Sequence, residues 1–214
     1  MKHGYFTSLG KSGTSEESNM KNLLVEYNVI TYGKELLAEA ADVTKPLMLK
    51  NVLLQRAEAK NQNGRIYPKE ILQREAGMYK ENFVVQRRAL GELDHPESPV
   101  VNLKNVCCNV TELWFEGQDV RGNIEILSTP SGNIVRELIK NNIRLGVSSR
   151  GMGSVKAIGE NTVEVGDDFS LICFDIVSNP STHGAFINEN KQSQIVTPYS
   201  RIDSLVYEFL SEIK

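Results

Sequence analysis

The feature of this sequence that most constrains its fold is a series of short apolar segments, each bounded by Gly, Asn or Asp residues, between residues 46 and 177. Segments of this length with such boundaries are typical of β-strands joined by turns. The clearest pair covers 106–115 and 120–127, and Gly117–Asp119 supplies the turn between them. The middle of the chain is therefore expected to be built largely from strands.

Two stretches depart from the strand pattern and have helical spacing. Pro68 is well placed at the start of a helix that continues to about Phe83, because proline is favoured in the first helical turn. A second helix is expected over 133–142, where apolar residues recur on one face. This second helix leads directly into the glycine-rich segment 146–154.

The two ends of the chain differ in composition from the middle. Residues 1 to about 21 are rich in Ser, Gly, Lys and Glu, so they bury too little apolar surface to offset the entropy of ordering. We predict a flexible amino-terminal arm over 1–45, a core over 46–190 and a tail over 191–214 that ends in a short amphipathic helix. Within the arm, 22–41 is apolar enough to dock on a surface, and the protein's own core is one such surface.

Composition excludes several classes of function. Twenty-four Lys and Arg against twenty-seven Asp and Glu give a formal charge of -3, which is too balanced for a protein that binds nucleic acid by neutralising phosphates. Three cysteines fit neither a secreted disulfide framework nor zinc ligation, and no apolar run approaches the ~18 residues of a membrane span. We expect a protein that stays in the cytoplasm of the cell that makes it.

Three histidines limit the choice of a general base near neutral pH. His3 lies in the arm, and His183 follows the last predicted strand. His95 stands in GELDHP, where an apolar strand gives way to a Pro-rich loop, and rigid scaffolds commonly present functional side chains at such points. The alternative is an ordinary histidine of a surface loop.

The segment GVSSRGMGS (146–154) is the second candidate for chemistry. Its glycines suggest a loop whose backbone amides approach a ligand closely and stabilise an oxyanion, and a serine hydroxyl there is a nucleophile if an imidazole reaches it. The alternative is a Gly/Ser hairpin with Arg150 on the surface. The spacing is that of neither a nucleophile elbow nor a phosphate-binding loop.

An acidic residue in an apolar strand is the third candidate. Asp175 lies within LICFDIV, and a buried carboxylate needs a partner because burying an unpaired charge is very costly. A histidine ring nitrogen is a suitable partner. The alternatives are an edge strand with Asp175 facing water, and His183 in the same orienting role.

These motifs together carry a resemblance to a known family. GELDHP and GVSSRGMGSV, with NQNGRIYPKEIL upstream, closely resemble the prohead core proteases of T-even-like tailed phages over about 47–180. The resemblance implies that His95 is the general base and Ser148 the nucleophile. It also implies an α+β fold, a mostly antiparallel β-sheet or barrel core flanked by helices, similar to that of herpesvirus maturational proteases.

The third catalytic member is less settled by this resemblance, because the herpesvirus proteases use a second histidine there. We favour Asp175 over His183, and we rank Asp94 and Glu92 lower because direct neighbours of the base orient it poorly. Backbone amides of Ser149, Arg150 and Gly151 would stabilise the oxyanion, with Arg150 supporting that loop. No metal or cofactor is needed.

The resemblance further implies the substrates: scaffold and core proteins and the major capsid protein, cut after Glu in Leu/Ile-x-Glu. The enzyme would act inside the prohead in the host cytoplasm, as a homo-oligomer. The chain itself has such sites at Glu39–Ala40 and Glu212–Ile213, which suggests self-processing and an inhibitory role for the arm. The alternative function is a catalytically silent structural or scaffold component of the prohead.

Overall fold

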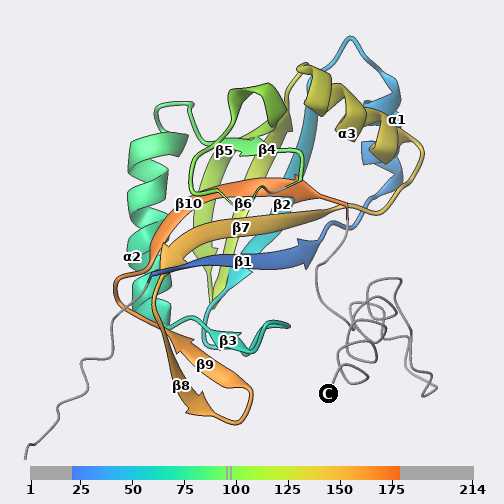
Figure 1. The fold of residues 1–214 in the computed structure, drawn as a ribbon. Coiled ribbons are helices and arrows are strands. Elements are labelled where there is room, and N and C mark those ends of the chain that lie inside the picture. The colour runs from blue at the N-terminus through green and yellow to red at the C-terminus, as the bar shows by residue number, and fades with distance from the viewer. Residues whose placement is uncertain (1–20, 95, 97, 179–214) are drawn as a thin grey trace, which may run out of the picture. The chain divides into compact units, whose positions relative to one another are not determined.

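The computed structural model describes residues 21–94, 96 and 98–178, which form β-sheets flanked by three α-helices (Figure 1). The strands are β1 (Asn22–Val29), β2 (Leu47–Arg56), β3 (Arg65–Ile66), β4 (Leu90–Glu92), β5 (Val106–Glu116), β6 (Asp119–Ile126), β7 (Gly146–Gly153), β8 (Val155–Gly159), β9 (Thr162–Val165) and β10 (Ser170–Val177). The α-helices are α1 (Lys34–Ala41), α2 (Lys69–Tyr79) and α3 (Pro130–Lys140). A π-helical turn (Lys80–Val84) continues α2, and a 3-10 turn (Leu103–Asn105) precedes β5.

The strands form three sheets with the orders β1-β7-β10, β2-β6-β5-β4 and β3-β9-β8. All strand pairs are antiparallel except β3 with β9. The predicted α+β fold with a mostly antiparallel β core is confirmed. In the described part of the chain the sheets stay open, so the barrel alternative is not formed.

The predicted hairpin and helices are present close to their expected positions. β5 and β6 are joined by a two-residue turn in which Gly117 has a φ of 65°, a left-handed conformation that favours glycine. Helix α2 begins immediately after Pro68, as expected. Helix α3 begins earlier than predicted, because the Thr129 hydroxyl accepts a hydrogen bond from the Gly132 amide at 3.0 Å and caps the helix.

The expected boundary of the core at residue 46 is wrong, because β1 and α1 are already part of the fold. β1 pairs along its whole length with β7, from Asn22 opposite Gly153 to Val29 opposite Gly146. The apolar segment 22–41 therefore docks on the protein's own core. Residues 1–20 and the tail 191–214 lie outside the described residues.

The expectation of a loop at 146–154 is also wrong, because this segment forms the central strand β7 of the first sheet. A side chain at Gly146 would meet the Tyr27 ring at 2.2 Å, and one at Gly151 would meet the Phe169 ring at 2.4 Å. These glycines leave room for the ring of Tyr27 in β1 and for that of Phe169, the residue before β10. Because glycine has no side chain, these two rings can pack directly against the backbone of β7.

The first and second sheets pack face to face around the main core. Asn28 of β1 donates a side-chain hydrogen bond to the Leu54 carbonyl of β2 at 2.9 Å. Helix α2 covers one part of this core, where the rings of Tyr79 and Phe174 meet edge to face at 5.5 Å. Helices α1 and α3 lie together at the other side of the ribbon (Figure 1). The sheets thus hold β7 and β10 in a fixed register.

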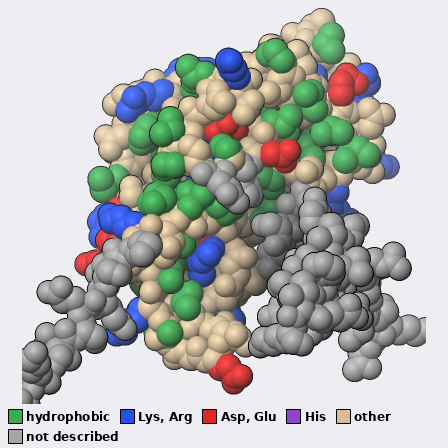
Figure 2. Space-filling model, in the orientation of Figure 1, with side chains coloured by type: hydrophobic (Ala, Val, Ile, Leu, Met, Phe, Trp, Pro, Cys, Tyr) green, Lys and Arg blue, Asp and Glu red, His purple; other side chains and the backbone are tan. Residues whose placement is uncertain are grey.

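The surface carries no single dominant charge on the face drawn in Figure 2. Lys and Arg side chains are scattered over that face, with hydrophobic side chains between them. Among the described residues, no helix is long and apolar enough to cross a membrane.

Two glycines in helices of equal length test how tightly the core is packed. A side chain at Gly132 in α3 would lie 1.9 Å from the Leu127 carbonyl oxygen, whereas nothing lies within 4 Å of one at Gly77 in α2. We expect Gly77→Ala to raise the free energy of unfolding by about 0.5–1 kcal/mol, because alanine is the better helix former. Gly132→Ala should lower it by about 1–3 kcal/mol through overpacking.

Urea denaturation of both variants and the wild type measures these changes. Equal effects of the two substitutions would contradict the packing described around α3.

Candidate active site

The proposed nucleophile and the proposed orienting carboxylate lie side by side on neighbouring strands. Ser148 of β7 is the register partner of Asp175 in β10 and of Tyr27 in β1. Cross-strand partners present their side chains on the same face of a sheet. We call the face that carries Ser148, Arg150 and Asp175 the site face. The two motifs that the sequence singled out separately are therefore brought together by the fold.

Ser148 and its neighbour Ser149 lie on opposite faces of the sheet. Successive residues of a strand point to opposite faces, and Ser149 pairs with Glu26 and Phe174. The Phe174 ring packs against Tyr79 in the core. The Ser149 side chain therefore lies on the face opposite to Asp175.

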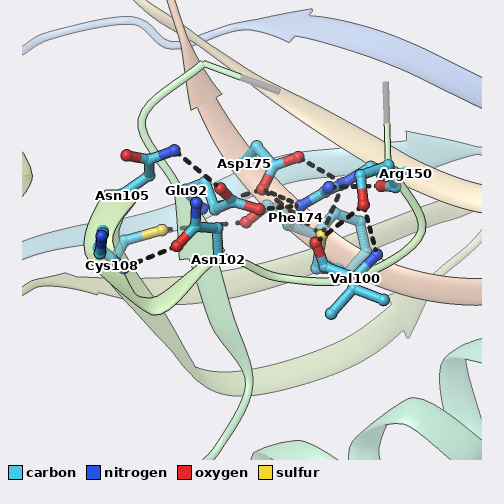
Figure 3. Close-up of polar contacts among 11 residues, drawn as sticks. Glu92, Val100, Asn102, Asn105, Cys108, Arg150, Phe174 and Asp175 are labelled. Atoms are coloured by element: carbon cyan, nitrogen blue, oxygen red, sulfur yellow. Dashed lines mark hydrogen bonds and ion pairs between the residues drawn. The ribbon is translucent and has the colours of Figure 1, made fainter. Parts of the chain in front are cut away.

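Arg150 is the best connected side chain of the site face, and it is fully buried. Its Nη2 donates to Glu92 Oε1 at 2.8 Å, and its Nη1 donates to the Ser98 carbonyl at 2.7 Å. Its Nε lies 3.0 Å from Asp175 Oδ2. Figure 3 shows Arg150, Glu92 and Asp175 pointing toward one another from different strands. Arg150 was expected to support the segment 146–154, but that segment is a strand, and Arg150 instead binds the Ser98 carbonyl in the loop after β4.

The Asp175 carboxylate is fully buried, and Oδ1 accepts hydrogen bonds from the Glu92 amide at 2.9 Å and from Arg150 Nη2 at 3.2 Å. Oδ2 has its ion pair with Arg150 but no partner of hydrogen-bond geometry. Burial raises the pKa of Asp175, and the Glu92 amide and the Arg150 guanidinium oppose that rise. β10 is an edge strand of its sheet, but Asp175 is buried, so the alternative in which it faces water is wrong.

The Ser148 hydroxyl is a second buried oxygen that accepts or donates no hydrogen bond within the described residues. The residue is 1% exposed, and its Oγ has no hydrogen-bond partner among the described residues. Buried polar atoms are rarely left unpaired, so each such atom calls for an explanation. Here two buried oxygens without a hydrogen bond, Ser148 Oγ and Asp175 Oδ2, belong to cross-strand partners on one face.

His95 itself lies outside the described residues, but the chain on both sides of it is anchored beside Ser148. Leu93 forms a bridge with Ile176, and the Asp94 amide donates to the Ile176 carbonyl at 2.8 Å. On the other side, the Ser98 carbonyl is held by Arg150. Leu93, Asp94 and Ser98, on both sides of His95, are therefore bound to the strands that carry Ser148 and Asp175.

The other candidates for the third catalytic member differ in their surroundings. Glu92 is fully buried but its Oε1 is taken by Arg150, and Asp94 is exposed. His183 lies outside the described residues. Sequence reasoning ranked Glu92 low as an orienting group and did not identify it as the partner of Arg150.

The expected oxyanion loop is not present as such. Ser149, Arg150 and Gly151 lie in β7, and each is paired with a residue of β1 and one of β10. Their backbone amides therefore point along the sheet toward neighbouring strands, and not out of the site face. The assignment of these amides to an oxyanion hole is corrected by this pairing.

Comparison with known proteins places this site in a family. A family model described as prohead core protein serine protease matches residues 15–195. The prohead core protein protease of Enterobacteria phage T4 is 31% identical over 158 residues, which cover 72% of this chain and 74% of that protein. The chain belongs to the family of prohead core protein serine proteases.

Structural comparison agrees with membership in the prohead protease family. The structure of the bacteriophage T4 capsid assembly protease matches with a TM-score of 0.65 and 25% sequence identity, over 76% of this chain and 100% of that one. The chain is thus a protease with the fold of that structure. These findings favour the enzyme over the catalytically silent component.

All three thiols of this prohead protease are buried, and one of them borders the site. Cys173 Sγ lies 3.2 Å from Arg150 Nε and 3.4 Å from Asp175 Oδ1. Burial and the Asp175 carboxylate raise the pKa of the Cys173 thiol, and the Arg150 charge does not offset this. In the described part of the chain, His, Cys, Asp and Glu side chains form no cluster of metal-ligand type.

The thiols provide a test of how closed the site is. We expect Cys107, Cys108 and Cys173 to react negligibly with a disulfide reagent in the native protein, because the reagent does not reach buried thiols. All three should react after unfolding in guanidinium chloride. Absorbance of the released thiolate measures the reaction, and rapid native labelling of Cys173, identified by mass spectrometry, would contradict the buried site.

Proposed function

We propose that this protease is a prohead maturation serine endopeptidase in which Ser148 is the nucleophile, His95 the general base and Asp175 the orienting carboxylate. The observation that carries the proposal is that two buried oxygens on cross-strand partners, Ser148 Oγ and Asp175 Oδ2, have no hydrogen-bond partner among the described residues, although Asp175 Oδ2 has its ion pair with Arg150. An imidazole between them satisfies both: one ring nitrogen accepts from the serine hydroxyl, and the other donates to the carboxylate. We assign that imidazole to His95, because Asp94 before it and Ser98 after it are bound to β10 and β7.

The reaction then follows the serine protease scheme. Ser148 Oγ bonds to the carbonyl carbon of the peptide while its proton passes to His95. The imidazolium gives that proton to the leaving amine as the carbon–nitrogen bond breaks, which leaves an acyl ester on Ser148. Water then attacks the ester by the same proton transfers, releases the new carboxyl terminus and restores the hydroxyl. Asp175 holds the imidazole in the required tautomer throughout.

Family membership supports scaffold and core proteins and the major capsid protein as the substrates. The protease would work inside the prohead in the host cytoplasm, as a homo-oligomer. Cleavage after Glu in Leu/Ile-x-Glu is the sequence preference that we propose for it. A protease confined with its substrates needs its activity delayed until the shell is assembled, and the 1% exposure of Ser148 is compatible with such a closed state.

Successive side chains of β7 point to opposite faces of the sheet, and this allows a sharp test of which serine is the nucleophile. We expect Ser148→Ala to abolish hydrolysis of a Leu-x-Glu peptide, because the attacking oxygen is lost. Ser149→Ala removes the same group one residue away, but from the opposite face, and should retain most of the activity. The matched measurement is peptide turnover together with labelling by a fluorophosphonate probe.

Retained turnover in Ser148→Ala, with loss in Ser149→Ala, would move the nucleophile to Ser149. Loss of labelling in His95→Ala provides the control for the general base.

Self-processing at Glu39–Ala40 has a structural requirement. The bond lies within α1, the Glu39 carbonyl accepts from Arg136 Nη1 at 3.2 Å, and Ala40 is fully buried. Proteolysis occurs preferentially in exposed, unstructured backbone. Helix α1 packs on α3 and β2. We propose that cutting after Glu39 requires α1 to undock. Glu212–Ile213 lies outside the described residues.

Ala38→Gly tests this requirement, because residue 38 is exposed and occupies the variable position of the Leu-x-Glu site. Glycine destabilises the helix by about 1 kcal/mol, which corresponds to an approximately fivefold larger undocked fraction. We expect intact-mass spectrometry to show residues 1–39 released about fivefold faster than in the wild type. Release in the Ser148→Ala, Ala38→Gly double variant should be absent, and equal rates with and without Ala38→Gly would refute the requirement.

A further inference from the structure

A single buried guanidinium joins the elements around Ser148. Arg150 contacts Glu92, Asp175, the Ser98 carbonyl and Cys173 Sγ, all within 2.7–3.2 Å. We call this set the Arg150 clasp. Its members come from β4, the segment after β4, β7 and β10. It therefore joins three parts of the chain that are distant in sequence: 92–98, β7 and β10.

The clasp holds both sides of the segment that contains His95. Glu92 precedes this segment and Ser98 follows the histidine, and the same side chain binds both. Arg150 lies two positions from Ser148 on the same face of β7. Arg150, which is part of the same strand as Ser148, thus binds the chain on both sides of His95.

Arginine is suited to this task and lysine is not. The planar guanidinium presents donors in a fixed fork, whereas an ammonium group on a flexible stem acts as a point charge. Burial lowers the pKa of Arg150, but Cys173, Asp175 and Glu92 together outweigh burial and raise this pKa above its ordinary value. Buried ion pairs are often no more stabilising than well-packed apolar groups, so stability alone does not account for this cluster.

We propose that Arg150 is a positioning residue, which sets the distance between the histidine segment and Ser148 by holding Glu92 and the Ser98 carbonyl. The proposal rests on the catalytic assignment of Ser148 and His95. Misplacement of a catalytic group by about 1 Å costs on the order of 100-fold in rate. The clasp therefore controls turnover more than substrate binding.

Arg150→Lys is the test variant, and Arg136→Lys is its matched control. Arg136 is also a buried arginine, at 7% exposure, and its donors bind the backbone carbonyls of Glu39, Ala40, Asp42 and Lys45, away from the site. Both variants lose an arginine that joins several segments. Only Arg150→Lys removes contacts to the histidine segment.

We expect Arg150→Lys to lower kcat about 100-fold with KM nearly unchanged. Hydrogen exchange should rise in the peptide covering 93–105 but not in β5 and β6. Arg136→Lys should lower the melting temperature and leave kcat per folded molecule as in the wild type. A folded Arg150→Lys protein with kcat within twofold of the wild type would overturn the proposal, as would equal kcat losses in the two variants.

A milder pair of variants keeps the test decisive if Arg150→Lys does not fold. The Ser98 hydroxyl accepts from the Val100 amide at 3.2 Å and so shapes the turn that presents the Ser98 carbonyl. Ser98→Ala should lower kcat severalfold, and Ser98→Thr, which keeps the hydroxyl, should restore it. Unchanged kcat in Ser98→Ala would overturn the proposal. Turnover that survives Ser148→Ala would instead refute the catalytic assignment. That result is distinguishable from failure of the Arg150 proposal, because it comes from a different variant.

Discussion

The arrangement around Ser148 depends on the buried ion cluster of Arg150, Glu92 and Asp175. Removing such charges from water costs several kcal/mol for each ion, and only mutual attraction with well-placed hydrogen bonds offsets that cost. Loss of one partner from a buried pair costs about 3–5 kcal/mol, because the other charge is left uncompensated. β4, β7 and β10 are therefore held in one relative position, and the cluster stabilises the strand register that places Asp175 beside Ser148.

Local sequence was sufficient for the strands and turns but not for the central strand. The β5–β6 hairpin, α2 and α3 follow from periodicity, a glycine turn and a proline start, all of which act over a few residues. The glycines of β7 suggested a loop because glycine permits unusual backbone conformations. In the fold they instead make room for the rings of Tyr27 and Phe169. That information resides in residues far from β7, and no local pattern contains it.

Local sequence patterns also predict the site only in part. The rule that an aspartate in an apolar strand needs a partner correctly selected Asp175, because desolvation acts on the residue itself. It did not identify the partners, which are the Glu92 amide and Arg150 as well as the proposed imidazole. Partner choice depends on the pairing of β7 with β10, set by long-range packing. The resemblance to prohead proteases supplied the roles of Ser148 and His95, which no local rule could assign.

The clasp also limits how a peptide reaches the nucleophile. Along β7, the Arg150 side of Ser148 is filled by fully buried groups, so displacement there would expose uncompensated charges. On the other side lies Gly146, with the partly buried Tyr27 ring across it. Moving an aromatic ring requires only rotation about side-chain bonds and breaks no ion pair. Access to a serine that is 1% exposed is therefore least costly from the Gly146 end of the strand, while the Arg150 end remains fixed.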